Sequence, residues 1–193
     1  APEKTENAFR IEPLSSNVGA EILDIDLSKP QPEEVYKDIR AALNKWGAIF
    51  FRDQSLSVEQ YFNFGRQFGE LEGKATHGHV DGFPQIGRLV KEADHMTSVG
   101  DMWHTDHTYM IKPVSFTMLH AIEIPPYGGD TLFAHAGRSF ETLPEGVKET
   151  LRSLKALHSR SYLIKDANYA AQYRKEHGVV GQEKGAASQT VHE

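Results

Sequence analysis

Apolar positions in the first third of the chain follow two periods, one typical of strands and one typical of helices. Three apolar runs have the length of strands, at residues 9–13, 20–25 and 48–51. Between the second and third runs, apolar residues recur every three to four positions, which predicts a helix over residues 33–45 that ends at Gly47. Ser57 and Gln60 have the spacing of a capping box and predict the start of a second helix. The run at 48–51 is continuous rather than alternating, which is typical of a strand buried on both faces.

The remainder of the chain is expected to contain more strands than helices. Strands are expected at 86–90, 103–109, 114–124, 131–135 and 159–164, and helices at 139–143 and 145–157. Residues 69–84 lack periodicity and predict a long loop. Residues 165–193 carry few recurring apolar positions, and we interpret them as a mobile, lid-like or disordered segment with a short helix over 169–176. The pattern favours a single domain over residues 1–193, mainly β with flanking helices (α+β).

Composition and charge narrow the function classes. A net charge of −6 with lysines interspersed among acids leaves no basic patch for nucleic acid. No apolar run approaches the roughly 18 residues of a membrane span, and the N-terminus has no signal-peptide core, so a cytoplasmic protein is expected. Because the chain has no cysteine, a metal would have to bind to histidines and carboxylates.

One histidine and one carboxylate stand two residues apart in the polar stretch at 103–109. On a strand, His104 and Asp106 would share a face with their Cα atoms about 6.6 Å apart, close enough to ligate one metal ion. Completed by a second histidine, this pair is the ligand set of non-haem Fe(II) oxygenases. Chance alone gives roughly 1.4 such pairs (10 × 27/193), and a second one, His79 with Asp81, lies in a glycine-rich stretch that is typical of a solvated turn. The pair therefore needs support from the surrounding sequence.

That support comes from five segments that occur in a fixed order. They are Val18-Gly19-Ala20-Glu21 with Ile25-Asp26-Leu27, Ile49-Phe50-Phe51-Arg52-Asp53-Gln54, Phe68-Gly69-Glu70-Leu71, Trp103-His104-Thr105-Asp106, and Gly128-Gly129-Asp130-Thr131-Leu132. Together they resemble the taurine dioxygenase family of Fe(II)/2-oxoglutarate-dependent oxygenases, which includes 2,4-dichlorophenoxyacetate dioxygenases. The resemblance runs from about residue 9 to 162 and implies a double-stranded β-helix (jelly roll, cupin-like).

The resemblance also implies roles for individual residues. His104 and Asp106 would be two of three ligands to Fe(II), and Thr131 would donate a hydrogen bond to the co-substrate 2-oxoglutarate, with O2 as the oxidant. The family's third ligand, a histidine, and its 2-oxoglutarate-binding arginine lie in a C-terminal part that this sequence does not contain. We therefore expect the domain to be incomplete at its C-terminus.

The residues at the positions where the family binds its substrate resemble the family less closely. Lys74 stands where taurine enzymes carry a sulfonate-binding histidine, His77 replaces a family tyrosine, and Gly100 replaces an asparagine. Lys74 and His77 could still meet an anionic group, and the backbone of His107 could line the pocket. The resemblance thus implies hydroxylation of a small organic anion, either a sulfonate such as taurine or an aryloxyalkanoate-like acid. Succinate and CO2 would be co-products, and the protein would be a homo-oligomer, a dimer or tetramer.

Two other functions remain open from the sequence. One is a metal- or ligand-binding jelly-roll module without catalysis, which the missing histidine and arginine would favour. The other is a cupin-like isomerase or hydrolase, against which the segments outside the metal motif argue.

Overall fold

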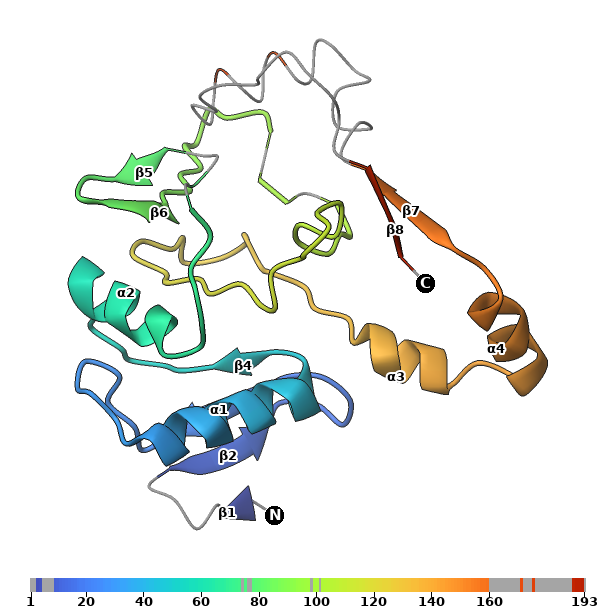
Figure 1. The fold of residues 1–193 in the computed structure, drawn as a ribbon. Coiled ribbons are helices and arrows are strands. Elements are labelled where there is room, and N and C mark those ends of the chain that lie inside the picture. The colour runs from blue at the N-terminus through green and yellow to red at the C-terminus, as the bar shows by residue number, and fades with distance from the viewer. Residues whose placement is uncertain are drawn as a thin grey trace. The chain divides into compact units, whose positions relative to one another are not determined.

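The computed structural model describes residues 3–4, 9–73, 75, 78–97, 99–100, 102–159, 171, 175 and 189–192. Contacts divide the chain into two compact units. Unit 1 comprises residues 1–70 and 119–151, and unit 2 comprises residues 71–118 and 152–193. Figure 1 labels the elements of both units in chain order. No helix within the described residues combines the length and apolar character needed to cross a membrane.

A four-stranded sheet and one long helix form the centre of unit 1. Its strands are β1 (Glu3–Lys4), β2 (Arg10–Pro13), β3 (Ala20–Leu23) and β4 (Ile49–Phe50), in the spatial order β1-β2-β3-β4. The first three are antiparallel, whereas β3 and β4 run parallel and are joined through helix α1 (Glu33–Trp46). A parallel pair requires such a crossover, because its strands cannot be joined by a tight turn.

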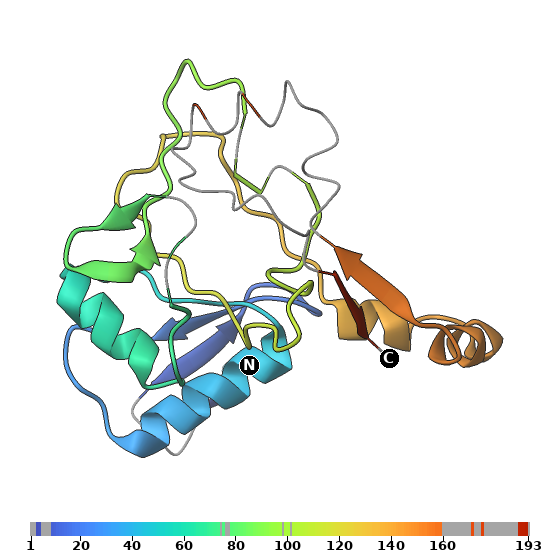
Figure 2. The same cartoon turned by 45° about the horizontal axis from the view of Figure 1, so that its top comes forward.

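Helix α1 lies along the sheet and closes the core of unit 1 (Figure 2). The buried apolar side chains come from the sheet, from α1 and from the segments beside them: Phe9, Ile11, Ala20, Ile22, Leu27, Val35, Ile39, Ala42, Ala48 and Phe64. The helix ends as predicted at Gly47, whose φ of 71° is left-handed and whose N–H donates to the Leu43 carbonyl at 2.8 Å. A Cβ at Gly47 would lie 3.0 Å from Cδ2 of His135, so this position also needs the absence of a side chain.

The predicted second helix is α2 (Val58–Arg66), and its capping box is confirmed. The N–H of Gln60 donates to the Ser57 hydroxyl at 3.2 Å, and the N–H of Ser57 donates to the Gln60 side chain at 2.8 Å. This pairing satisfies two amide groups that the first turn of a helix leaves without partners.

The run at 48–51 is a strand over only two residues, and the prediction that it is buried on both faces is wrong. Strand β4 is an edge of the sheet, and Ile49 and Phe50 are both partly exposed. A continuous apolar run cannot by itself distinguish a central strand from an edge strand whose open face is covered by aromatic contacts. Here the ring of Phe50 meets Phe133 edge to face at 5.8 Å between centroids.

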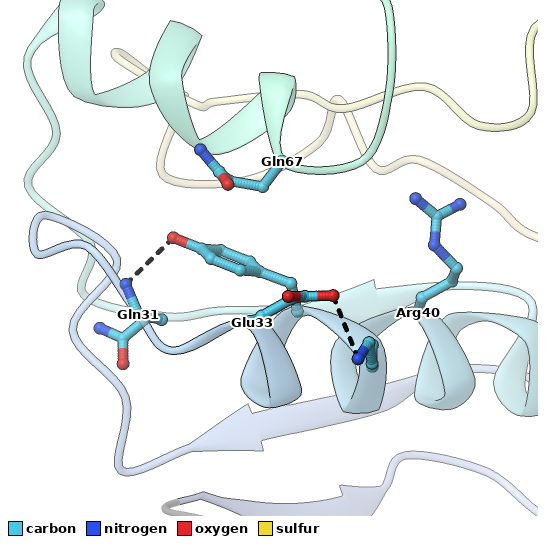
Figure 3. A pocket seen from close by; sticks show the side chains of 6 residues that line it. Gln31, Glu33, Arg40 and Gln67 are labelled. Carbon is cyan, nitrogen blue, oxygen red and sulfur yellow. Dashed lines mark hydrogen bonds and ion pairs between the residues drawn. The ribbon is translucent and has the colours of Figure 1, made fainter.

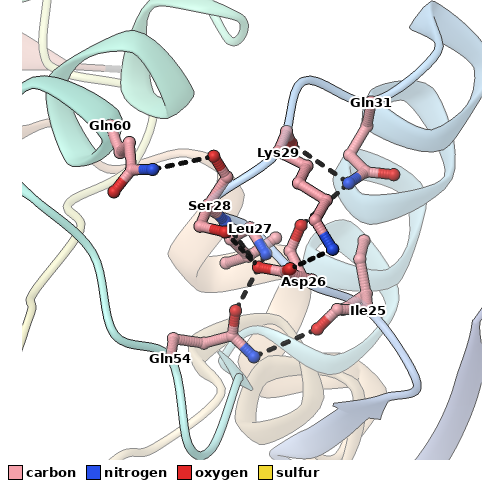
Figure 4. Close-up of polar contacts among 8 residues, drawn as sticks. All are labelled: Ile25, Asp26, Leu27, Ser28, Lys29, Gln31, Gln54 and Gln60. Carbon is pink, nitrogen blue, oxygen red and sulfur yellow. Dashed lines mark hydrogen bonds and ion pairs between the residues drawn. The ribbon is translucent and has the colours of Figure 1, made fainter.

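Polar contacts hold together the two loops that flank the sheet in unit 1 (Figure 4). Asp26 accepts hydrogen bonds from the hydroxyl and the N–H of Ser28, at 2.5 and 3.0 Å, and forms an ion pair with Lys29 at 2.9 Å. The Ser28 hydroxyl, followed by Lys29, lowers the pKa of the exposed Asp26 carboxyl to about 2. The carboxylate therefore keeps these contacts at any pH near neutrality.

Gln54 connects the same two loops through both ends of its amide (Figure 4). Its oxygen accepts from the N–H of Leu27 at 2.9 Å, and its NH2 donates to the carbonyls of Ile25 and Arg52 at 3.1 and 2.9 Å. Gln54 thus ties the segment after β4 to the segment after β3, whose bonded residues lie 27 and 29 positions earlier in the chain.

We expect Gln54→Glu to lower the free energy of unfolding by about 1–3 kcal/mol. The substitution keeps the shape of the side chain but replaces the NH2 donor by an oxygen that faces two carbonyls. Urea denaturation would measure the loss, with Gln67→Glu as the matched control, because the Gln67 amide donates to one carbonyl of its own helix, that of Asn63. Equal shifts of the denaturation midpoint in both variants would contradict the prediction.

The second segment of unit 1 contains two short helices and little else that is regular. These are α3 (Ala136–Glu141) and α4 (Glu145–Arg152), close to the helices predicted at 139–143 and 145–157, although α4 ends five residues earlier. The strands predicted at 114–124 and 131–135 are absent, and both stretches lack regular secondary structure. An alternating pattern forms a strand only where a neighbouring backbone supplies ladder hydrogen bonds. No described segment pairs with these two.

Unit 2 contains two antiparallel pairs of strands. Strand β5 (His79–Val80) pairs with β6 (Phe83–Gly87), so the strand predicted at 86–90 begins three residues earlier and ends at Gly87. Strand β7 (Ala156–Ser159) pairs antiparallel with β8 (Gln189–His192), where the sequence predicts no regular element. Only Ser159 of the strand predicted at 159–164 is described. The helix predicted at 169–176 and most of the segment 165–193 lie outside the described residues.

Sheets and helices are thus both present, as predicted. The described residues do not form a closed barrel.

Candidate metal centre

The stretch that carries His104 and Asp106 is not a strand, and the prediction for residues 103–109 is wrong. Residues 103–105 are irregular and residues 106–109 form a turn, in which the N–H of Met110 donates to the His107 carbonyl at 2.9 Å. His107 has a left-handed φ of 55°, which is incompatible with an extended strand. The irregular backbone nevertheless brings the two predicted ligands together, with Nε2 of His104 3.2 Å from Oδ1 of Asp106.

The imidazole of His104 is oriented by its other nitrogen. Nδ1 lies 2.7 Å from the carbonyl oxygen of Met102. Because a carbonyl only accepts, Nδ1 is the nitrogen that donates to it, which leaves Nε2 as the nitrogen that could bind a metal ion. Gly100, with a φ of 74°, leaves room for this ring, since a Cβ there would lie 3.1 Å from Cε1 of His104.

The carboxylate of Asp106 is held in the same manner. Its Oδ2 accepts a hydrogen bond from the hydroxyl of Thr117 at 2.6 Å, while Oδ1 faces His104. Both ligand side chains are 41% exposed, so an ion from solvent can reach them.

The spacing of these two atoms fits a shared metal ion. Two ligand atoms at about 2.1 Å from a metal and at right angles to each other are about 3.0 Å apart, close to the observed 3.2 Å between Nε2 and Oδ1. Among the residues that the structure describes, no group of three or more histidine, aspartate and glutamate side chains could hold a metal ion. By its spacing the pair fits two adjacent ligands of one metal ion, and a third ligand is not found among the described residues.

His107, a predicted substrate-binding residue, follows this pair in the chain, but its side chain contacts Glu72. Its Nδ1 is 2.7 Å from a carboxylate oxygen of Glu72, and its ring is 5.8 Å from that of Tyr109. The contact joins the loop after Leu71 to the stretch that carries His104 and Asp106, within unit 2. Glu72 carries no signal in the sequence that would have identified it, because the pair is 35 positions apart.

The structure does not test the roles of the other predicted site residues. Lys74 and His77 lie outside the described residues. Thr131 is exposed and follows two glycines with left-handed φ, Gly128 and Gly129. It belongs to unit 1, whereas His104 and Asp106 belong to unit 2. Its role in binding 2-oxoglutarate stays a prediction.

The second His-x-acid pair matches a solvated turn. His79 lies in β5 and Asp81 in the turn that follows, and both are exposed. No metal-ligand geometry joins their side chains to a third group within the described part of the chain.

A hollow of about 580 Å³ lies between α1 and α2 (Figure 3) and is lined by Gln31, Glu33, Tyr36, Lys37, Arg40 and Gln67. Its cationic groups already have partners within the protein. Lys37 pairs with Glu33 and Glu34, both at 3.1 Å, and Arg40 donates to the Phe68 carbonyl at 2.6 Å. None of the predicted site residues that the structure describes lines this hollow, so the candidate site remains the pair in unit 2.

Comparison with known proteins identifies the family of the chain. The model of the family "Taurine catabolism dioxygenase TauD, TfdA family" matches residues 10–189. The alpha-ketoglutarate-dependent 2,4-dichlorophenoxyacetate dioxygenase of Burkholderia sp. (strain RASC) is 32% identical over 164 residues, covering 74% of this chain and 54% of that protein. The alpha-ketoglutarate-dependent sulfonate dioxygenase of Saccharomyces cerevisiae is 31% identical over 164 residues, covering 78% of this chain and 39% of that protein.

Solved structures show the same relationship. A crystal structure described as a putative alpha-ketoglutarate-dependent taurine dioxygenase from Burkholderia xenovorans superposes with a TM-score of 0.68 and 32% sequence identity, covering 80% of this chain and 56% of that one. The chain spans about half the length of the curated relatives it matches. Since the family model covers nearly all of the sequence, the chain belongs to the taurine catabolism dioxygenase TauD, TfdA family.

Proposed function

We propose that the protein is an Fe(II)- and 2-oxoglutarate-dependent dioxygenase that hydroxylates a small organic anion and releases succinate and CO2. The observation that supports this most is the orientation of the two ligands. Nε2 of His104 and Oδ1 of Asp106 lie side by side at 3.2 Å, while the other polar atom of each side chain is engaged by the protein. In a chain of this family, a pair arranged in this way fits the iron site.

The residues of this chain would prepare the site rather than carry out the oxidation. His104 and Asp106 would hold the iron, and the negative charge of Asp106 would offset part of the charge of the metal. When bound, the iron supplies, with 2-oxoglutarate and O2, the oxidant for a substrate C–H bond. The third ligand, a histidine, and an arginine for 2-oxoglutarate are expected from the family resemblance, together with a jelly-roll core. Thr131 would add a hydroxyl donor for a co-substrate carboxylate.

The proposed substrate class rests on the relatives and on the loop after Leu71. Relatives are named for 2,4-dichlorophenoxyacetate, sulfonates and sulfate esters, all of which are organic anions. The loop carries Lys74, a flexible point charge that suits a sulfonate or a carboxylate without strong discrimination. Glu72 in the same loop contacts His107 at 2.7 Å, which supports a position of the loop beside the metal-binding stretch.

Substrate-dependent succinate release by the full-length protein tests the proposal. We expect one of a panel of sulfonates, sulfate esters and aryloxyalkanoates to stimulate turnover of 2-oxoglutarate. With the best substrate, Lys74→Ala should raise KM roughly tenfold, the equivalent of about 1.4 kcal/mol of binding, with a smaller change in kcat. Lys29→Ala is the matched control, because Lys29 is a surface lysine of unit 1 whose partner is Asp26.

Three results would count against the proposal. A neutral or cationic best substrate would overturn the substrate class, and an unchanged KM in Lys74→Ala would remove that residue from the site. Binding of metal without any succinate release across the panel would favour a non-catalytic binding module.

A further inference from the structure

The hydroxyl of Thr117 lies 2.6 Å from Oδ2 of Asp106, 11 residues earlier in the chain. We propose that Thr117 is a positioning residue that keeps Asp106 bound to the iron through one oxygen only. The inference rests on the proposed function, because it concerns the same metal site. Neither the metal motif nor its flanking residues point to Thr117 in the sequence.

The direction of this hydrogen bond follows from the chemistry of the two groups. An ionised carboxylate can only accept, so the threonine hydroxyl donates. A distance of 2.6 Å lies in the range of O–H···O⁻ bonds, which are charge-assisted and roughly twice as strong as neutral ones. The bond therefore engages Oδ2 and leaves Oδ1 as the carboxylate oxygen that could bind a metal ion.

The hydrogen bond from Thr117 determines which oxygen of Asp106 faces His104. With Oδ2 engaged by Thr117, Oδ1 is the oxygen 3.2 Å from Nε2 of His104. A carboxylate that bound the metal through both oxygens would have to share the electron density of Oδ2 between the metal and the Thr117 hydroxyl, which makes Oδ2 the weaker ligand of the two. An iron held by His104, a second histidine and one oxygen of Asp106 would keep one more position for other ligands than an iron held by both oxygens of Asp106. Thr117 thus preserves a position that the co-substrates need.

The same contact constrains the backbone that carries the ligand. Residues 110–118 lack regular secondary structure, so no helix or strand fixes their position relative to Asp106. The hydrogen bond between Asp106 and Thr117 closes this irregular stretch into a loop within unit 2. Because Asp106 is 41% exposed and Thr117 is also exposed, water competes for the carboxylate. The effect of losing the hydroxyl should therefore lie near the lower end of the 10–100-fold range found for partners of metal ligands.

Metal affinity of the full-length protein tests the inference without relying on activity. Mn(II) is titrated into each variant, and the free ion is followed by its electron paramagnetic resonance signal. Thr117→Val replaces the hydroxyl by a methyl group at nearly constant volume, and we expect its Kd for Mn(II) to rise about tenfold. Thr117→Ser keeps the donor and should restore the Kd to within about twofold of wild type. Ser115→Ala removes a hydroxyl from the same stretch, and Asp106→Ala is the reference for loss of a ligand.

The outcomes separate this inference from the proposed function. Weaker binding in Thr117→Val than in wild type, Thr117→Ser and Ser115→Ala, with an unchanged thermal midpoint, supports the positioning role. Wild-type affinity in Thr117→Val while Asp106→Ala loses binding would overturn the role of Thr117 and leave the iron site intact. Equal losses in Thr117→Val and Thr117→Ser would also overturn it, because the hydroxyl would then not be the cause. Retained binding in Asp106→Ala would reject the metal centre itself.

Discussion

Replacing either His104 or Asp106 by alanine is expected to abolish Fe(II) binding and 2-oxoglutarate turnover in the full-length protein. Each supplies one of the two adjacent ligand atoms, Nε2 and Oδ1, that lie 3.2 Å apart. Losing a residue that merely orients a metal ligand costs 10–100-fold in affinity, so losing a ligand should cost more than about 100-fold. Bound iron per chain and succinate formation would be measured for both variants.

The chain offers a matched control for this experiment. His79 and Asp81 have the same spacing as the proposed ligands, but both are exposed, in β5 and the turn after it. His79→Ala and Asp81→Ala should therefore keep wild-type iron content. Normal iron content in both His104→Ala and Asp106→Ala would show that this pair is not the metal site.

The second large effect is expected from the aromatic cluster beneath α2. Phe64→Ala should lower the free energy of unfolding by about 3–5 kcal/mol, the usual cost of removing a buried aromatic ring. Phe64 is buried, and its ring lies 5.2 Å from that of Phe68 and 6.1 Å from those of Tyr36 and Phe51, measured between centroids. Its loss would leave a cavity among three rings that rigid neighbours cannot fill. Urea or thermal denaturation would measure the change.

Val58 on the same helix provides the control. It is 40% exposed, so Val58→Ala should change the free energy of unfolding by less than about 1 kcal/mol. Phe64→Leu should restore part of the loss, because it refills much of the cavity with apolar volume. A Phe64→Ala midpoint close to that of Val58→Ala would mean that α2 is not anchored through this ring.

Helices were the part of the fold that the sequence predicted best. Helix α1 was expected over 33–45 and runs from Glu33 to Trp46, and Ser57 with Gln60 does form the capping box of α2. The contacts that decide a helix lie within four residues along the chain, so a single stretch contains them. Strands were predicted less well, and the stretches at 103–109, 114–124 and 131–135 are irregular. Their ladder partners would have to come from elsewhere in the chain, which local periodicity cannot reveal.

The sequence alone determined the family of this protein and the pair His104 and Asp106, because a motif records which residue types stand at which spacing. It placed that pair on a strand, whereas the structure places it on an irregular stretch and a turn. Either backbone can bring together the side chains of residues that are two positions apart. Only the tertiary structure decided which atoms face each other. The contacts of Thr117 with Asp106 and of Glu72 with His107 depend on the path of an irregular chain. Such a path is set by packing and hydrogen bonds between distant residues, and no local pattern encodes it.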